Sequence, residues 1–99
     1  MISDIPRQKL CEIVVRYSRS VCDDPRRCEG LLRDFCGGYR REIFALVNAL
    51  RERITEDLLA TSEGVPQEIL LARLAKRLED HRGHDQELAR WAVESWGVA

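Results

Sequence analysis

Apolar residues recur along this chain at the three- and four-residue spacing of amphipathic helices, and no segment shows the alternation typical of a strand. The clearest helix runs from Pro25 to Cys36, where Asp23 or Asp24 can cap the first turn and proline suits the first helical position. The Gly37-Gly38 pair is expected to end it, because glycine readily adopts the left-handed conformation found there. A helix this short needs neighbours against which to pack its apolar stripe. The stripe comprises Cys28, Leu31, Leu32, Phe35 and Cys36.

Other segments carry comparable helical patterns and bring the expected bundle to five or six short helices. They span about residues 6–20, 39–53, 56–61, 66–81 and 85–96. Segment 39–53 is the most apolar, so we expect it at the centre, whereas 56–61 is either a separate helix or its frayed end. Val15 and Ile69 are expected at the edges of their apolar stripes. The pattern predicts one all-α domain over residues 1–99, folded as a compact bundle.

The overall charge balance limits the classes of partner. Apolar residues make up 44% of the chain and charged residues 33%, which is typical of a folded helical domain. The net charge of −1 gives no general attraction to nucleic acid or anionic lipid. No apolar run is long enough to span a bilayer and no signal peptide is recognisable, so we expect a cytoplasmic protein without membrane contact.

No residue pattern in the chain indicates catalysis. It lacks a G-x-S-x-G nucleophile elbow, a phosphate-binding glycine loop and an H-E-x-x-H zinc motif. The two histidines, His81 and His84, could hold a metal together with Asp80 or Asp85. The favoured interpretation is a helix end, in which Gly83 stops one helix and Asp85 caps the next. We therefore expect no enzymatic activity, no cofactor and no bound metal.

The cysteines are expected to be reduced thiols that pack as small apolar side chains. Without a secretion signal a disulfide is not favoured, and zinc sites need close cysteine pairs that this chain lacks. A disulfide and a metal site remain as lesser alternatives. The four residues are Cys11, Cys22, Cys28 and Cys36.

Charged clusters supply most candidates for a binding surface. Residues 1–53 carry eleven Lys/Arg and eight Asp/Glu, a net of +3, while residues 54–99 carry five and nine, a net of −4. The basic candidates lie around the 25–36 helix and are Arg26, Arg27, Arg40 and Arg41, with Arg33 between them. The acidic candidates are Glu56, Asp57, Glu79 and Asp80. An ordinary solvated surface is the alternative interpretation of these charges.

Two tryptophans near the end of the chain supply a further candidate. Trp91 and Trp96 lie five residues apart, about 500° of helical rotation, so they cannot share one narrow stripe. If Trp96 is part of the core, Trp91 is expected to be partly exposed. An exposed tryptophan is a suitable anchor for a protein partner.

Two strings stand out within segments 21–36 and 87–96. They are D-D-P-R-R-C at residues 23–28 and A-R-W-A-V-E-S-W at residues 89–96. Nearly the whole chain resembles a short helical accessory module found fused to larger bacterial signalling proteins, including serine/threonine kinases and Hsp70-like chaperones. These two strings are the most specific part of that resemblance. The resemblance implies an accessory or adaptor role and transfers no site residues. Six helices in this length also resemble the death-fold superfamily of homotypic adaptors, by helix number and length alone.

The leading hypothesis is a non-catalytic protein–protein interaction module that acts as an adaptor in bacterial signalling or regulation. Its expected partners are other protein modules, including a second copy that meets basic with acidic surface. Contacts between exposed charges are weak and salt-sensitive, so we expect a monomer or weak self-association. The alternative is a small nucleic-acid-binding domain, in which segments 66–81 and 85–96 form a helix-turn-helix. Acidic Asp85, Glu87 and Glu94 on the reading helix would oppose that binding.

Overall fold

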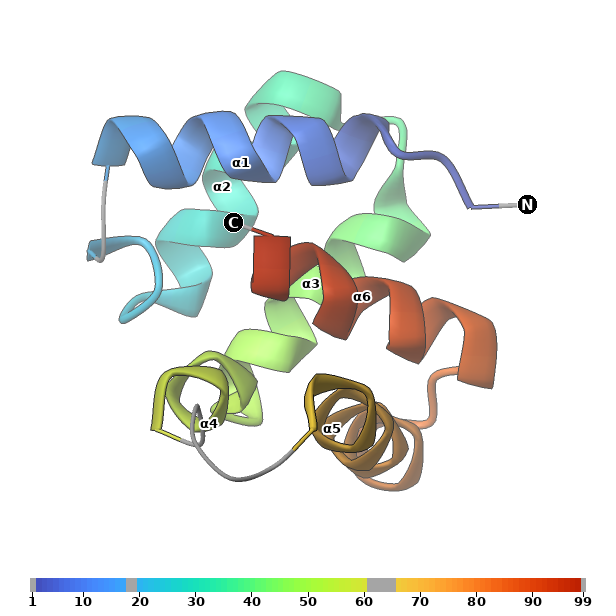
Figure 1. Ribbon diagram of the computed structural model, residues 1–99. Coiled ribbons are helices and arrows are strands. Elements are labelled where there is room, and N and C mark those ends of the chain that lie inside the picture. The colour runs from blue at the N-terminus through green and yellow to red at the C-terminus, as the bar shows by residue number, and fades with distance from the viewer. Residues whose placement is uncertain (1, 18–19, 61–65, 99) are drawn as a thin grey trace.

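Six α-helices and no strand make up the part of the chain that this computed structural model describes, residues 2–17, 20–60 and 66–98. They are α1 (Ile5–Tyr17), α2 (Pro25–Cys36), α3 (Arg40–Arg51), α4 (Ile54–Ala60), α5 (Gln67–Arg82) and α6 (Gln86–Val98). In Figure 1, α3 and α6 lie between α1 on one side and α4 and α5 on the other. The all-α bundle predicted from the sequence is confirmed. Within the described ranges, no helix is long and apolar enough to cross a membrane.

Capping residues set the start of α2, the end of α5 and the start of α6 where the sequence predicts them. The Asp24 side chain accepts a hydrogen bond from the Arg27 amide at 3.2 Å, and α2 begins at Pro25. The Asp85 side chain accepts one from the Leu88 amide at 3.0 Å at the start of α6. Gly83 ends α5 with φ of 72°, in the left-handed region, as expected.

Gly37 ends α2 for a different reason from the one predicted. Its φ of −57° and ψ of −18° are right-handed, and Gly38 is not left-handed either. A Cβ atom at position 37 would lie 2.7 Å from the carbonyl oxygen of Arg33. Glycine is needed here because the backbone approaches itself closely, so the predicted left-handed termination is wrong.

A turn separates α3 from α4, so they are two helices. The sequence had left open whether the second was separate or the frayed end of the first. Arg53 adopts a left-handed conformation, with φ of 58°, and its amide donates to the carbonyl of Leu50 at 3.0 Å. This turn ends α3 at Arg51, two residues before the predicted limit, and lets α4 start at Ile54, whose side chain is fully buried. Residue 61, the predicted end of the next helix, and residues 18 and 19, near the predicted end of the first, lie outside the described residues.

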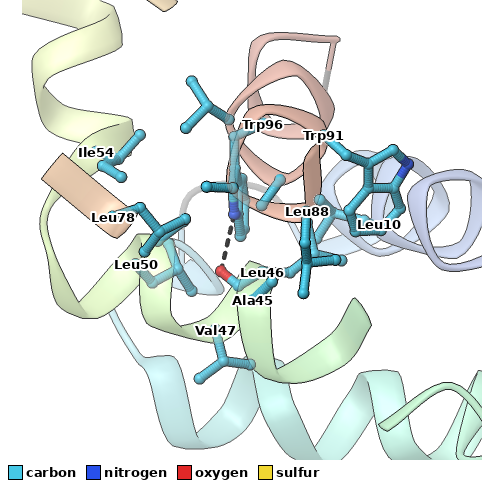
Figure 2. Close-up of a cluster of buried hydrophobic side chains, with 14 of the residues drawn as sticks. Leu10, Ala45, Leu46, Val47, Leu50, Ile54, Leu78, Leu88, Trp91 and Trp96 are labelled. Atoms are coloured by element: carbon cyan, nitrogen blue, oxygen red, sulfur yellow. Dashed lines mark hydrogen bonds between the residues drawn. The ribbon is translucent and has the colours of Figure 1, made fainter. Parts of the chain in front are cut away.

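The core forms where α3 crosses α6. α3 packs against α2, α4, α5 and α6, which confirms its predicted place at the centre. Leu46 is completely buried, and Leu50 lies one turn further along the same face. At the crossing, the Nε1 atom of Trp96 donates a hydrogen bond to the Leu46 carbonyl at 2.9 Å (Figure 2). α6 therefore joins α3 through both apolar packing and a buried polar contact.

Some positions in the predicted apolar stripes face solvent instead. Phe35 is 46% exposed and Val15 is 86% exposed, while Ile69 is also exposed. In a bundle of short helices, each outer helix has few neighbours and buries only a narrow strip. The predicted stripes were therefore too wide at these three positions.

The central place of α3 makes its core residues sensitive to truncation. Changing Leu46 or Leu50 to alanine should lower the free energy of unfolding by about 2–5 kcal/mol, because transfer energy is lost and a cavity remains. Val15→Ala, on exposed α1 surface, should change it by less than about 0.5 kcal/mol. Urea denaturation followed by circular dichroism measures both. Equal effects at buried and exposed positions would contradict this packing.

Candidate functional site: a basic groove between α2 and α3

A groove with a volume of about 690 Å³ lies between α2 and the first turns of α3. Ile43 is buried beneath it, whereas Phe44 is 53% exposed. Three arginines and one glutamate contribute the formal charges of its lining. The lining residues are Glu29, Arg33, Gly37, Arg40, Arg41, Ile43 and Phe44. The groove thus combines positive charge with an accessible aromatic ring.

The arginines of the groove differ in how far their charge is compensated. Glu29 holds Arg33 at 3.3 Å and also lies 3.8 Å from Arg51. Arg41 pairs with Asp85, which precedes α6. Arg40 makes no ion pair with any other residue in the described part of the chain, and its side chain is exposed. Arg40 is therefore the groove cation most available to a ligand.

The other two basic candidates lie away from this groove. Arg26 and Arg27 occupy the first turn of α2, six or seven residues before Arg33, which is about 10 Å along the helix axis at about 1.5 Å per residue. The guanidinium of Arg27 lies 5.2 Å from the ring centre of Tyr17, which joins α2 to α1 through a cation–π contact. The structure thus groups Arg40 and Arg41 with Arg33, and it separates Arg26 and Arg27 from them.

The four acidic candidates do not form one surface. Asp57 lies 2.6 Å from Arg77 of α5, so its charge is compensated within the chain. Asp57 and Asp80 line a groove between α4 and α5 together with three basic residues, Arg73, Lys76 and Arg77. Glu79 lies in a different groove, between α5 and α6, and Glu56 belongs to α4. The expected acidic face is therefore divided.

Trp91 is buried, and the prediction that it is partly exposed is wrong. Only 7% of its surface is accessible, and its Nε1 atom donates a hydrogen bond to Asp4 at 3.2 Å. The guanidinium of Arg7, from α1, lies 5.6 Å from the centre of the Trp91 ring. The two tryptophans do occupy different faces of α6, but α1 covers the second face (Figure 2). Trp91 is therefore a core residue in this chain.

A set of polar contacts, here called the α3 clamp, fixes the turn between α5 and α6 against α3. Glu52 accepts from the Nε atom of Arg82 at 2.7 Å and lies 2.8 Å from the Nδ1 atom of His81. The side-chain Nδ2 atom of Asn48 lies 2.9 Å from the Nε2 atom of His84. Arg41 and Asp85 complete the clamp next to the groove. Phe44 also meets the His84 ring edge to face, with centroids 5.8 Å apart.

Sequence reasoning missed Asn48 and Glu52. Asn48 is a buried polar residue in the most apolar helix, and a polar group buried there needs a hydrogen-bond partner. The spacing of Arg41, Asn48 and Glu52, seven and four residues, places them on one side of α3 and of the cap residue that follows it. This spacing was the signal by which the sequence could have revealed them.

The predicted cap at Asp85 is confirmed. In addition, His84 contacts Asn48 of α3, and His81 contacts Glu52 directly after the helix. Among the described residues, no three His, Cys, Asp or Glu side chains gather as a metal site.

The clamp contains groups whose proton affinity depends on folding. Burial lowers the pKa of His84 below its ordinary value of 6.5; Asp85 opposes this shift, and Arg82 and Arg41 reinforce it. The hydrogen bond from His81 lowers the pKa of Glu52, with further help from Arg82. The Leu88 amide and Arg41 lower the pKa of Asp85. All three shifts make protonation less favourable in the folded protein than in the unfolded chain.

The stability of the fold should therefore fall on acidification, beginning with His84. Its folded pKa lies below the unfolded value, so its contribution is present above pH 6.5 and is lost as the pH falls through the folded pKa. We expect a lower urea midpoint at about pH 5.5 than at about pH 7. His84→Gln, which keeps a polar partner for Asn48, should reduce this difference.

The matched control for this experiment is His81→Gln, which changes the more exposed histidine and should leave the His84 contribution in place. The glutamate and aspartate shifts act at lower pH, below 4.5 for Glu52. An unchanged difference in midpoint for His84→Gln would contradict the assignment to His84.

The cysteines differ in burial and hence in reactivity. Cys28 and Cys36 are buried, whereas Cys11 and Cys22 are half-buried. Burial raises the pKa of Cys28 to about 12 and also raises the pKa of Cys36. Alkylation requires the thiolate, so native Cys28 should react far more slowly than Cys11 with iodoacetamide at neutral pH. Peptide mass mapping measures this, with urea-unfolded protein as the control. Equal native rates at Cys28 and Cys11 would show that Cys28 is not buried.

The fold and the groove together define a small all-α bundle with one surface that is both basic and aromatic. The chain matches no protein-family model, no curated protein and no solved structure. The resemblance to an accessory module of signalling proteins therefore rests on the two sequence strings, and it serves only as support for a proposal.

Proposed function

We propose that this chain is a non-catalytic protein-interaction module, and that it binds its partner through the groove between α2 and α3. The observation that carries this proposal is the position of Arg40 beside Phe44. Arg40 is exposed and has no ion-pair partner among the described residues, and Phe44 is half-exposed in the same groove. Arginine and aromatic side chains dominate the binding energy of many protein interfaces.

The chemistry of the groove favours a partner segment that is acidic and also carries an apolar side chain. Carboxylates of the partner would pair with Arg40. They would also approach Arg33 and Arg41, which already pair with Glu29 and Asp85. Exposed ion pairs contribute only about 0–1 kcal/mol each, so they guide orientation and association rate more than affinity. Packing on Phe44 and the neighbouring groove wall would supply the larger part of the affinity.

The adaptor role in a cytoplasmic bacterial signalling or regulatory protein is supported by the resemblance of two strings. In D-D-P-R-R-C, Asp24 caps α2, Pro25 starts it and Cys28 is buried. In A-R-W-A-V-E-S-W, both tryptophans are buried. The strings therefore consist largely of residues that determine the fold, while the binding residues Arg40 and Phe44 lie outside them.

Nucleic-acid binding is the second candidate function, because Arg33, Arg40 and Arg41 come together at the groove. The helix-turn-helix form of this candidate is weakened by α6, which would have to enter the DNA groove. Trp91 and Trp96 of α6 are buried in the bundle, and the carboxylate of Glu87, which has no ion-pair partner among the described residues, would repel phosphates.

The test compares native protein with Arg40→Glu and Phe44→Ala as immobilised baits. Partners bound through the groove should be lost with either variant. Arg73→Glu, an equal charge change on exposed α5, should retain them. Arg41→Glu is a poorer choice, because it would place a carboxylate against Asp85 in the α3 clamp. Retention of every partner by both groove variants would overturn the proposal.

Titration with duplex DNA over a range of salt separates the two candidate functions. Phosphate contacts release counterions, so real DNA binding weakens steeply as salt increases. Tight, salt-dependent binding that Arg40→Glu abolishes would replace the protein-interaction proposal with the nucleic-acid one. Absence of such binding would favour a protein partner.

A further inference from the structure

A second groove, on the outer side of the α5–α6 hairpin, has the opposite character to the first. It has a volume of about 340 Å³, and its lining residues are Ala72, Ala75, Glu79, Gln86, Glu87 and Arg90. The two alanines contribute little side-chain volume between the helices. Arg90 is held by Glu94 at 2.8 Å, so the charge of the only cation in this lining set is already compensated.

The carboxylates of this second groove lack such partners. Neither Glu79 nor Glu87 makes an ion pair with another residue in the ranges that the structure describes. Glu79 lies in the last turn of α5 and Glu87 in the first turn of α6, on either side of the connecting turn. The second groove therefore presents two uncompensated negative charges beside a recess formed with small side chains.

We propose that the occupant of the α2–α3 groove is a second copy of this chain, which contributes its α5–α6 groove. Phe44 of one copy enters the recess beside Ala72 and Ala75 of the next. Arg40 then meets Glu79 and Glu87 in the same contact. The inference rests on the proposed function and names its partner.

The two grooves are complementary in charge, since one carries uncompensated Arg40 and the other carries uncompensated Glu79 and Glu87. Phe44, which is half-exposed in the first groove, supplies the apolar side chain for the recess of the second. Phe44 is already about half covered within the chain, so its entry into such a recess would bury only the exposed part of the ring, on the order of 100 Å². The contact joins unlike surfaces, so it is heterologous and leaves one groove of each kind free unless the assembly closes. Because the charges are exposed, association should be weak in moderate salt and stronger as the Debye length grows.

The α4–α5 groove offers a poorer match for the same basic surface. It contains Asp57 and Asp80, but Arg77 compensates Asp57, and Arg73 and Lys76 lie nearby. Glu79 and Asp80 are adjacent in sequence and line different grooves of α5. This adjacency supplies a matched pair of substitutions, in which the same charge change is made on two sides of one helix.

The test is a charge exchange followed by sedimentation velocity at high micromolar concentration and about 0.01 M ionic strength, where the Debye length is about 30 Å. Native protein should self-associate. Arg40→Glu and Glu79→Arg alone should each weaken association roughly tenfold or more, since each places like charges together. The double variant Arg40→Glu/Glu79→Arg, and a mixture of the two single variants, should associate again. Asp80→Arg should behave like native protein.

Phe44→Ala should weaken association even in the double variant, because it removes the side chain that fills the recess. Thermal melting monitored by circular dichroism checks that each variant is folded. Three results would each overturn the inference. The native protein could be strictly monomeric, or Asp80→Arg could weaken association as much as Glu79→Arg does. The third is a double variant that is folded but does not regain association. If Arg40→Glu still abolishes capture of another acidic protein, the proposed function stands without a second copy as partner. If Arg40→Glu affects neither, both are wrong.

Discussion

The hydrogen bond from the Trp96 indole to the Leu46 carbonyl marks the contact on which the rest of the bundle depends. A buried indole N–H needs an acceptor, and a helix carbonyl can accept a second hydrogen bond beside its own helical one. The bond therefore fixes how far along α3 the α6 helix lies. Once α6 is placed, Trp91 on its other face is available to α1, and the α5–α6 hairpin can contact the end of α3. Packing and polar contacts thus specify the same arrangement.

α3 carries three different environments around its circumference. One side is core, with Leu46 and Leu50, and one edge carries the polar groups that hold the α5–α6 turn. The remaining side presents Arg40 and Phe44 to the groove. Because the inner side is fully engaged, the outer residues are held by a backbone that has little freedom to move. A binding surface on such a helix is preorganised, which reduces the entropy lost on association.

Local features of the sequence predicted the helices well, and tertiary features escaped it. The start of α2 depends on Asp24 and Pro25, which are neighbours in the chain, so its position could be predicted. The burial of Trp91 depends on the start of the chain, where Asp4 and Arg7 lie more than eighty residues away, and no periodicity within α6 reveals that cover. Charge along the sequence predicted one basic cluster around both ends of the 25–36 helix, but only Arg33, Arg40 and Arg41 come together at the groove. The division of the acidic candidates was not predicted either, because Glu79 and Asp80 differ only in which side of α5 they occupy.

The separation of inner and outer faces on α3 has a consequence for how such a module can diverge. Ile43, Leu46 and Leu50 are constrained by the core, whereas Arg40 and Phe44 contribute little to it. After duplication of the gene, paralogous copies could exchange the outer residues while keeping the inner ones. Each copy could then present a groove of different chemistry on an unchanged scaffold, because a few surface side chains determine what the groove can accept or reject.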